Sequence, residues 1–214
     1  MVYLIVCKWV MPPVTVTQLQ SLMAGDGLKR DYVPSVQISS AVKLAAIASE
    51  DQLFPEHGGF DWKAIEKSMD PASGKRKKKR ALGAAASTIL SRPLKMYFCG
   101  RTFGWTRYVR KVPEMFYTKM IEWIWGKQRI MEVYLNTIEM GRGVYGIEPA
   151  AQTYFHKPAA TLTPTESAKI IACLPNPKVF TVVPISKRVA WRYPQILRQM
   201  NNLQGDPLVA EIIH

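Results

Sequence analysis

The stretch "TPTESAKIIACLPNP", residues 163–177, carries the start and stop signals of a helix at fixed spacing. Thr163 is a typical N-cap residue, Pro164 suits the first helical position, and Glu166 stands where it completes a capping box. Pro175 cannot continue the helical hydrogen bonding, so the helix has to end near it. The pattern therefore predicts a short, sharply bounded helix.

Most of the remaining pattern is also helical, and strand signals are few and short. The other helical stretches are residues 39–50, 60–69, 112–125, a continuation after the break at Gly126, and 146–155. Residues 1–35 are broken by proline and glycine and are interpreted as a membrane-proximal stalk. We therefore expect a mainly α protein, with a single helical domain over residues 36–214.

The composition supports a folded domain that attracts anions. Hydrophobic residues make up 48% of the 214 residues, and the formal net charge is +13. Such a charge fits nucleic acid, an anionic membrane or a phosphate-bearing substrate, and does not choose among them. Cys7, Cys99 and Cys173 show neither metal-binding nor disulfide spacing, so we interpret them as structural thiols.

The apolar N-terminal run "MVYLIVCKWVMPP" is too short to cross a bilayer, which takes about 20 apolar residues. It meets Lys8 and then two prolines. Both the end of a truncated membrane anchor and a buried segment remain open, and the former fits the features below better.

The densest polar stretch is "ASEDQLFPEHGGFDW", residues 48–62. Glu50 and Asp51 follow an apolar helix, and Phe54 and His57 come next. Ordinary surface acids at a helix end are the simpler interpretation of an isolated acidic pair. Here the crowding of acids, an aromatic residue and a histidine favours a site, because a carboxylate at the end of an apolar helix can be desolvated and so become a better base.

Two further clusters follow. "RYVRKVPEMFYTKMIE", residues 107–122, places Arg110 and Lys111 before Glu114 and a set of aromatic residues. Adjacent Arg and Lys bind phosphate or diphosphate well, although a solvated charged face is the alternative. "GKQRIMEVYLN", residues 126–136, has helical spacing, with Lys127, Glu132 and Asn136 as its polar members.

These clusters, in this order, resemble the motifs of the family-51 glycosyltransferases, the peptidoglycan transglycosylases, and the chain looks closest to the monofunctional biosynthetic kind. The likeness runs from about residue 34 to 203. The matching stretches are "EDQLFPEHGGFD" (50–61), "GAAASTI" (83–89), "RKVPE" (110–114), "KQRIMEVYLN" (127–136) and "GVYGIEPAA" (143–151). Five ordered matches make coincidence a poor explanation.

The resemblance implies a lysozyme-like helical glycosyltransferase domain that polymerises lipid II into glycan strands, in cell-wall biogenesis and the maintenance of cell shape. By analogy, Glu50 is the general base and Glu114 a second catalytic acid near the leaving diphosphate. The substrate-binding residues that it implies are Asp51, Phe54, His57, Ser87, Thr88, Lys95, Arg101, Arg110, Lys111, Lys127, Glu132, Asn136 and Glu148.

The resemblance also implies partners and a place in the cell. Lipid II, the growing glycan strand and the membrane surface are the expected partners, with other wall-synthesis proteins beside them and no nucleic acid. The expected location is the bacterial inner membrane, with the catalytic domain on its outer, periplasmic face. No metal-ligand cluster is recognisable and no cofactor is required, which leaves room for a divalent cation (Mg²⁺ or Mn²⁺) at the diphosphate.

The second motif departs from the family after Ile89. The family continues with a hydroxyl residue and two glutamines, whereas this chain has "LSRPLKMYFCGR", residues 90–101. Codons for this stretch can be read in a neighbouring frame that restores the family pattern, so our hypothesis is a local frameshift, in the gene or in its sequencing. The alternative is true divergence, with Arg92 and Pro93 at the donor site and activity in doubt.

Three other functions stay open from the sequence. A lytic transglycosylase or lysozyme-type enzyme is also helical and also depends on a glutamate, but it needs no diphosphate site. A nucleic-acid-binding module would use the basic run at residues 75–80, although the acids of the first cluster oppose phosphate binding there. The third is an inactive homologue.

Overall fold

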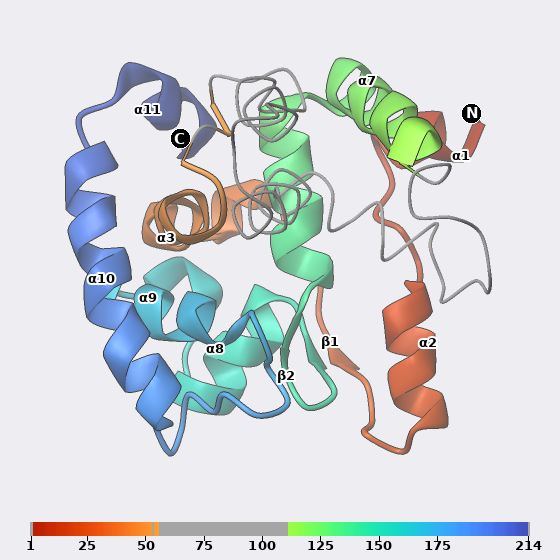
Figure 1. Cartoon of the computed structure of the whole chain (residues 1–214). Coiled ribbons are helices and arrows are strands. Elements are labelled where there is room, and N and C mark those ends of the chain that lie inside the picture. The colour runs from red at the N-terminus through yellow and green to blue at the C-terminus, as the bar shows by residue number, and fades with distance from the viewer. Residues whose placement is uncertain (1, 53, 56–110, 214) are drawn as a thin grey trace, which may run out of the picture.

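The computed structural model in Figure 1 describes residues 2–52, 54–55 and 111–213, with the backbone alone for residues 2–3 and 111–119. The described part is mainly helical, as predicted. Its helices are α1 (Val2–Val6), α2 (Val16–Met23), α3 (Ser40–Glu50), α7 (Lys111–Thr137), α8 (Ile147–Phe155), α9 (Pro164–Cys173), α10 (Lys187–Leu203) and α11 (Pro207–Ile213), with 3-10 turns η1 (Ser35–Gln37) and η2 (Ala159–Thr161).

Helix α3 is enclosed by other helices. It packs against α9, α10 and α11, and its residues from Val42 to Ala48 are all buried. A helix with two turns buried on every face is stable only inside a protein, which explains why α3 occupies the core. The Ser39 hydroxyl starts the helix by accepting a hydrogen bond from the Ala41 N–H at 3.3 Å, and it donates one to the Leu162 carbonyl at 3.1 Å.

The helix boundaries predicted from capping signals are confirmed at α9. The Thr163 hydroxyl accepts from the Glu166 N–H, and the Glu166 carboxylate accepts from the Thr163 N–H at 2.8 Å. Pro164 is the first helical residue, and the helix ends at Cys173, shortly before Pro175.

Helix α7 is bent at Gly126, where the sequence pattern breaks. Gly126 has φ 74° and ψ 169°, a conformation that side chains of L-residues disfavour. The helix continues on both sides of this point, and its second half runs through the middle of the molecule (Figure 1). Its first half holds α1, because the indole N–H of Trp125 donates to the Leu4 carbonyl at 2.7 Å.

A small sheet joins the N-terminal segment to the central part of the chain. Its strands are β1 (Lys29–Arg30), β2 (Glu139–Gly141) and β3 (Val144–Tyr145), in the order β1-β3-β2. Strand β1 pairs in parallel with β3, and β2 pairs antiparallel with it. The Asp26 carboxylate reinforces this junction through Lys178 at 2.5 Å and Arg142 at 3.1 Å.

Residues 2–35, which the sequence assigns to a stalk, therefore make contacts with the helical body. The boundary at residue 36 stays a prediction. Two of the three predicted structural thiols, Cys7 and Cys173, are buried. Burial raises the pKa of the Cys173 thiol to about 12, which keeps it protonated. Cys99 lies outside the described residues.

One prediction concerns the turn between β2 and β3. Gly143 has φ 67°, and a Cβ atom there would lie 2.2 Å from the Asp26 carbonyl oxygen. We expect Gly143→Ala to lower the free energy of unfolding by about 2 kcal/mol or more, from backbone strain and this collision together. Urea denaturation measures it. Gly205→Ala is the control, since open space surrounds that position, and equal effects of the two changes would contradict the prediction.

Candidate active site

Glu50 is the last residue of α3 and is half-buried. The helix ends there because Asp51 leaves helical geometry (φ −163°, ψ 88°), while its N–H still donates to the Ile47 carbonyl at 3.1 Å. Since the residues from Val42 to Ala48 are buried, core packing fixes where the backbone of Glu50 lies.

The chain turns immediately after Glu50. The Phe54 N–H donates to the Asp51 carbonyl at 3.1 Å, and the Phe54 side chain is fully buried. The Lys127 ammonium lies over the Phe54 ring, 4.5 Å from its centroid, in a cation–π contact. The structure thus brings the first and fourth sequence motifs together at this turn.

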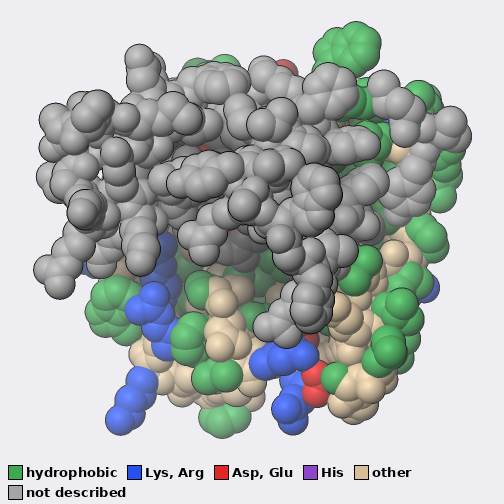
Figure 2. Space-filling model, turned by 45° about the vertical axis from the view of Figure 1, so that its right-hand side comes forward, with side chains coloured by type: hydrophobic (Ala, Val, Ile, Leu, Met, Phe, Trp, Pro, Cys, Tyr) green, Lys and Arg blue, Asp and Glu red, His purple; other side chains and the backbone are tan. Residues whose placement is uncertain are grey.

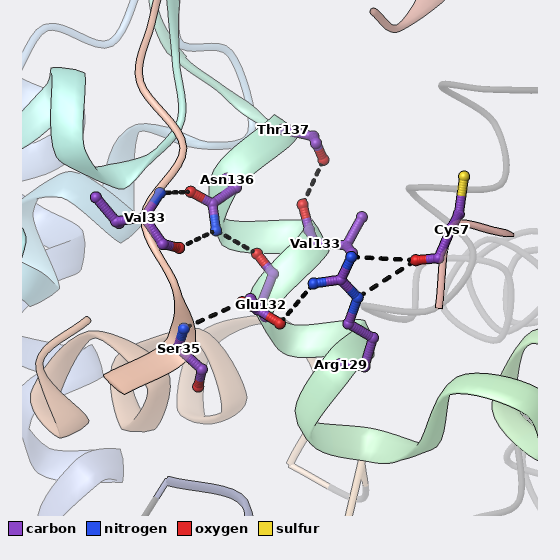
Figure 3. Close-up of polar contacts among 8 residues, drawn as sticks. All are labelled: Cys7, Val33, Ser35, Arg129, Glu132, Val133, Asn136 and Thr137. Carbon is purple, nitrogen blue, oxygen red and sulfur yellow. Dashed lines mark hydrogen bonds and ion pairs between the residues drawn. The ribbon is translucent and has the colours of Figure 1, made fainter. Parts of the chain in front are cut away.

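Glu132 and Asn136 of α7 bind the segment that leads into α3 (Figure 3). The Asn136 amide accepts from the Val33 N–H and donates to the Val33 carbonyl, both at 2.9 Å. Glu132 accepts from the Ser35 N–H at 3.1 Å and pairs with Arg129 at 2.8 Å. Both side chains therefore position backbone, and their predicted role in substrate binding stays a prediction.

Glu148 of α8 also binds backbone near the start of α3. Its carboxylate accepts from the Ala159 N–H at 2.7 Å and from the Gln152 side chain at 3.0 Å. The Ala159 carbonyl in turn accepts from the N–H of Ser39, the N-cap of α3, at 3.3 Å. Contacts of the fourth and fifth motifs thus converge on the start of the helix that ends in Glu50.

A buried cation also lies on α3. Lys43 donates to the Ile213 carbonyl at 3.1 Å and so attaches α11 to this helix. Burial lowers the pKa of Lys43, and the negative charge of Glu132 opposes that shift. This contact joins α3 to the C-terminal helix α11.

The structure does not describe the side chains of the remaining predicted site residues. His57, Ser87, Thr88, Lys95, Arg101 and Arg110 lie outside the described residues. For Lys111 and Glu114 only the backbone is described, at the start of α7. Their predicted roles stay predictions.

Sequence reasoning missed Glu122. Its carboxylate lies 2.5 Å from the Lys127 ammonium, and only 13% of its side chain is exposed. Residues five apart do not share a face of a regular helix, so their spacing does not predict the ion pair. The only sequence signal for it is Gly126, the glycine between them, which indicates a bend.

Comparison with known proteins places the chain in a family. The transglycosylase family model matches residues 16–201. Biosynthetic peptidoglycan transglycosylases from the Crooks strain of Escherichia coli and from Escherichia coli O139:H28 are each 47% identical over 181 residues. These matches cover 85% of this chain and 72% of each relative. With most of its length matched in both comparisons, the chain belongs to the transglycosylase family.

Proposed function

We propose that the chain is a peptidoglycan glycosyltransferase that polymerises lipid II into glycan strands. Family membership and the names of the E. coli relatives support this function. The structural observation that carries the proposal is Glu50, half-buried at the end of a helix whose residues from Val42 to Ala48 are all buried. The word "biosynthetic" in the names of the relatives favours synthesis of glycan over its cleavage.

In the proposed reaction, Glu50 takes the proton from the 4-hydroxyl of the acceptor sugar. The hydroxyl oxygen then forms the new bond to the anomeric carbon of the donor, and the bond from that carbon to the lipid diphosphate breaks. An α-linked donor gives a β-linked product, so the base acts on the face opposite the leaving group. Arg110 and Lys111 are proposed to stabilise the negative charge that develops on the departing diphosphate, and Glu114 is proposed to lie near it as the second acidic residue.

A divalent cation at the diphosphate remains a prediction. Within residues 2–52, 54–55 and 111–213, no three His, Cys, Asp or Glu side chains gather into a metal-binding group.

We also propose a lysozyme-like arrangement, in which helices surround a glutamate at the end of a buried helix and a small sheet lies nearby. The helical content and the three-stranded sheet support it.

The side of the molecule formed by α1, α2 and the first half of α7 is proposed to lie on the outer face of the inner membrane. Trp9, Met23 and Trp123 are 71%, 82% and 88% exposed, and further apolar side chains of this side are also exposed: Ile5, Val6, Val10, Leu19 and Leu22. Figure 2 shows hydrophobic side chains along its right-hand part. Tryptophan is well suited to the interface between membrane and water. Among the described helices none has the length and apolarity to span a bilayer.

One prediction of the proposed function concerns Glu50. We expect Glu50→Gln to slow lipid II polymerisation by about 10²–10⁴-fold, because an amide cannot accept the sugar proton. Gel analysis of glycan strands formed from labelled lipid II measures the rate. The control is Glu211→Gln, which neutralises an exposed acid of α11.

A version with two glutamines restored after Ile89, tested in parallel, should be faster than the unaltered chain. Unchanged rates for both Glu50→Gln and the restored version would contradict these assignments. Cleavage of mature glycan without polymer formation would favour the lytic alternative. Residues 90–101 lie outside the described residues, so the structure does not test the frameshift. Resequencing the gene tests it.

Another prediction of the proposed function concerns the membrane. We expect Trp9→Ser to weaken sedimentation with vesicles of phosphatidylglycerol and phosphatidylethanolamine by about tenfold, because a large apolar contact with lipid is lost. Trp191→Ser is the matched control, since Trp191 is 57% exposed but lies on α10, on the opposite side of the molecule (Figure 1). Equal binding by both variants would contradict the assignment, as would concentration-dependent dimerisation that Trp9→Ser abolishes.

A further inference from the structure

Glu122 is a carboxylate held away from water close to the candidate active site. Only 13% of its side chain is exposed, and its carboxylate lies 2.5 Å from the Lys127 ammonium. Lys127 is itself only 21% exposed. Apart from this ammonium, the described residues bring no hydrogen-bond donor to either carboxylate oxygen. A largely buried acid depends strongly on the cation that compensates it, so this pair is a specific feature of the site.

The bend in α7 creates the pair. In a regular helix, side chains meet at spacings of three or four residues, whereas Glu122 and Lys127 are five apart. Gly126 stands between them in a left-handed conformation (φ 74°), which redirects the second half of the helix. A Cβ atom at Gly126 would meet nothing within 4 Å, so backbone conformation alone calls for glycine there.

The pair acts on the turn after Glu50 through Lys127. The Lys127 ammonium lies 4.5 Å from the centroid of the fully buried Phe54 ring. The Phe54 backbone binds the Asp51 carbonyl, directly after Glu50. A contact that fixes Phe54 thus limits where the residues beside the base can move. Because the lysine side chain has four rotatable bonds, its pairing with a fixed anion restricts where the ammonium can lie over this ring.

We propose that Glu122 is a positioning residue for glycosyl transfer. Its carboxylate holds the Lys127 ammonium against Phe54 and thereby fixes the turn that follows Glu50. The role rests on the proposed function, since it concerns the geometry of the proposed base. Glu122 touches neither substrate nor the reacting atoms in this role.

The kinetic test uses lipid II polymerisation by the full chain. We expect Glu122→Gln to lower kcat by about 10–100-fold with KM within about twofold, because small displacements of a catalytic group cost rate rather than substrate affinity. Glu122→Asp keeps the charge and should recover most of the rate. The double variant with Lys127→Met should be no slower than Lys127→Met alone, because both changes break the same link.

The matched control is Glu166→Gln, which neutralises one partner of another 2.5 Å ion pair, with Lys157. It should leave kcat unchanged. A rise in KM at constant kcat for Glu122→Gln would overturn the proposal, because Glu122 would then act through substrate binding by Lys127. Additive losses in the double variant, or an equal loss in the control, would also overturn it.

A second readout does not depend on activity. With 4-fluorophenylalanine at position 54, the ¹⁹F resonance should shift in Glu122→Gln and stay close to its original position in Glu122→Asp and in Glu166→Gln. An unmoved resonance in Glu122→Gln would overturn the positioning role even if the unaltered chain forms no polymer. Absence of polymer from the unaltered chain, together with the expected ¹⁹F shifts, would instead count against the proposed function alone.

Discussion

The structure depends on the burial of α3. The residues from Val42 to Ala48 are buried on every face of this helix, which is stable only because α9, α10 and α11 pack against it. The free energy gained by this burial also fixes the end of the helix, where Glu50 is half-buried. The placement of the proposed base thus follows from core packing rather than from the loop beyond it.

Polar side chains of the later motifs form specific contacts at both ends of α3. Asn136 and Glu132 bind the backbone just before α3, and Glu148 connects to its N-cap through the Ala159 backbone. Lys127 contacts the turn just after the helix. Motifs that are separate in the sequence therefore support the same helix from both ends. Part-buried polar contacts of this kind favour one arrangement, because another would lose these partners of the backbone groups.

Local signals predicted much of the fold. The capping box at Thr163 and the break at Gly126 both follow from rules that act within a few residues, and the structure confirms both. The partners of Asn136 could not be predicted, because Val33 lies far away in the sequence and is brought near only by the fold. Glu122 was missed for a related reason. Its pairing with Lys127 exists only because the helix bends between them.

The most direct test of the central claim is an experimental structure of the chain with a lipid II analogue and an acceptor saccharide bound. The account predicts a Glu50 oxygen within about 3 Å of the acceptor 4-hydroxyl. It also predicts Arg110 and Lys111 against the diphosphate, across the reacting carbon from that carboxylate. A bound acceptor with its 4-hydroxyl far from Glu50, or a diphosphate held elsewhere, would contradict the account.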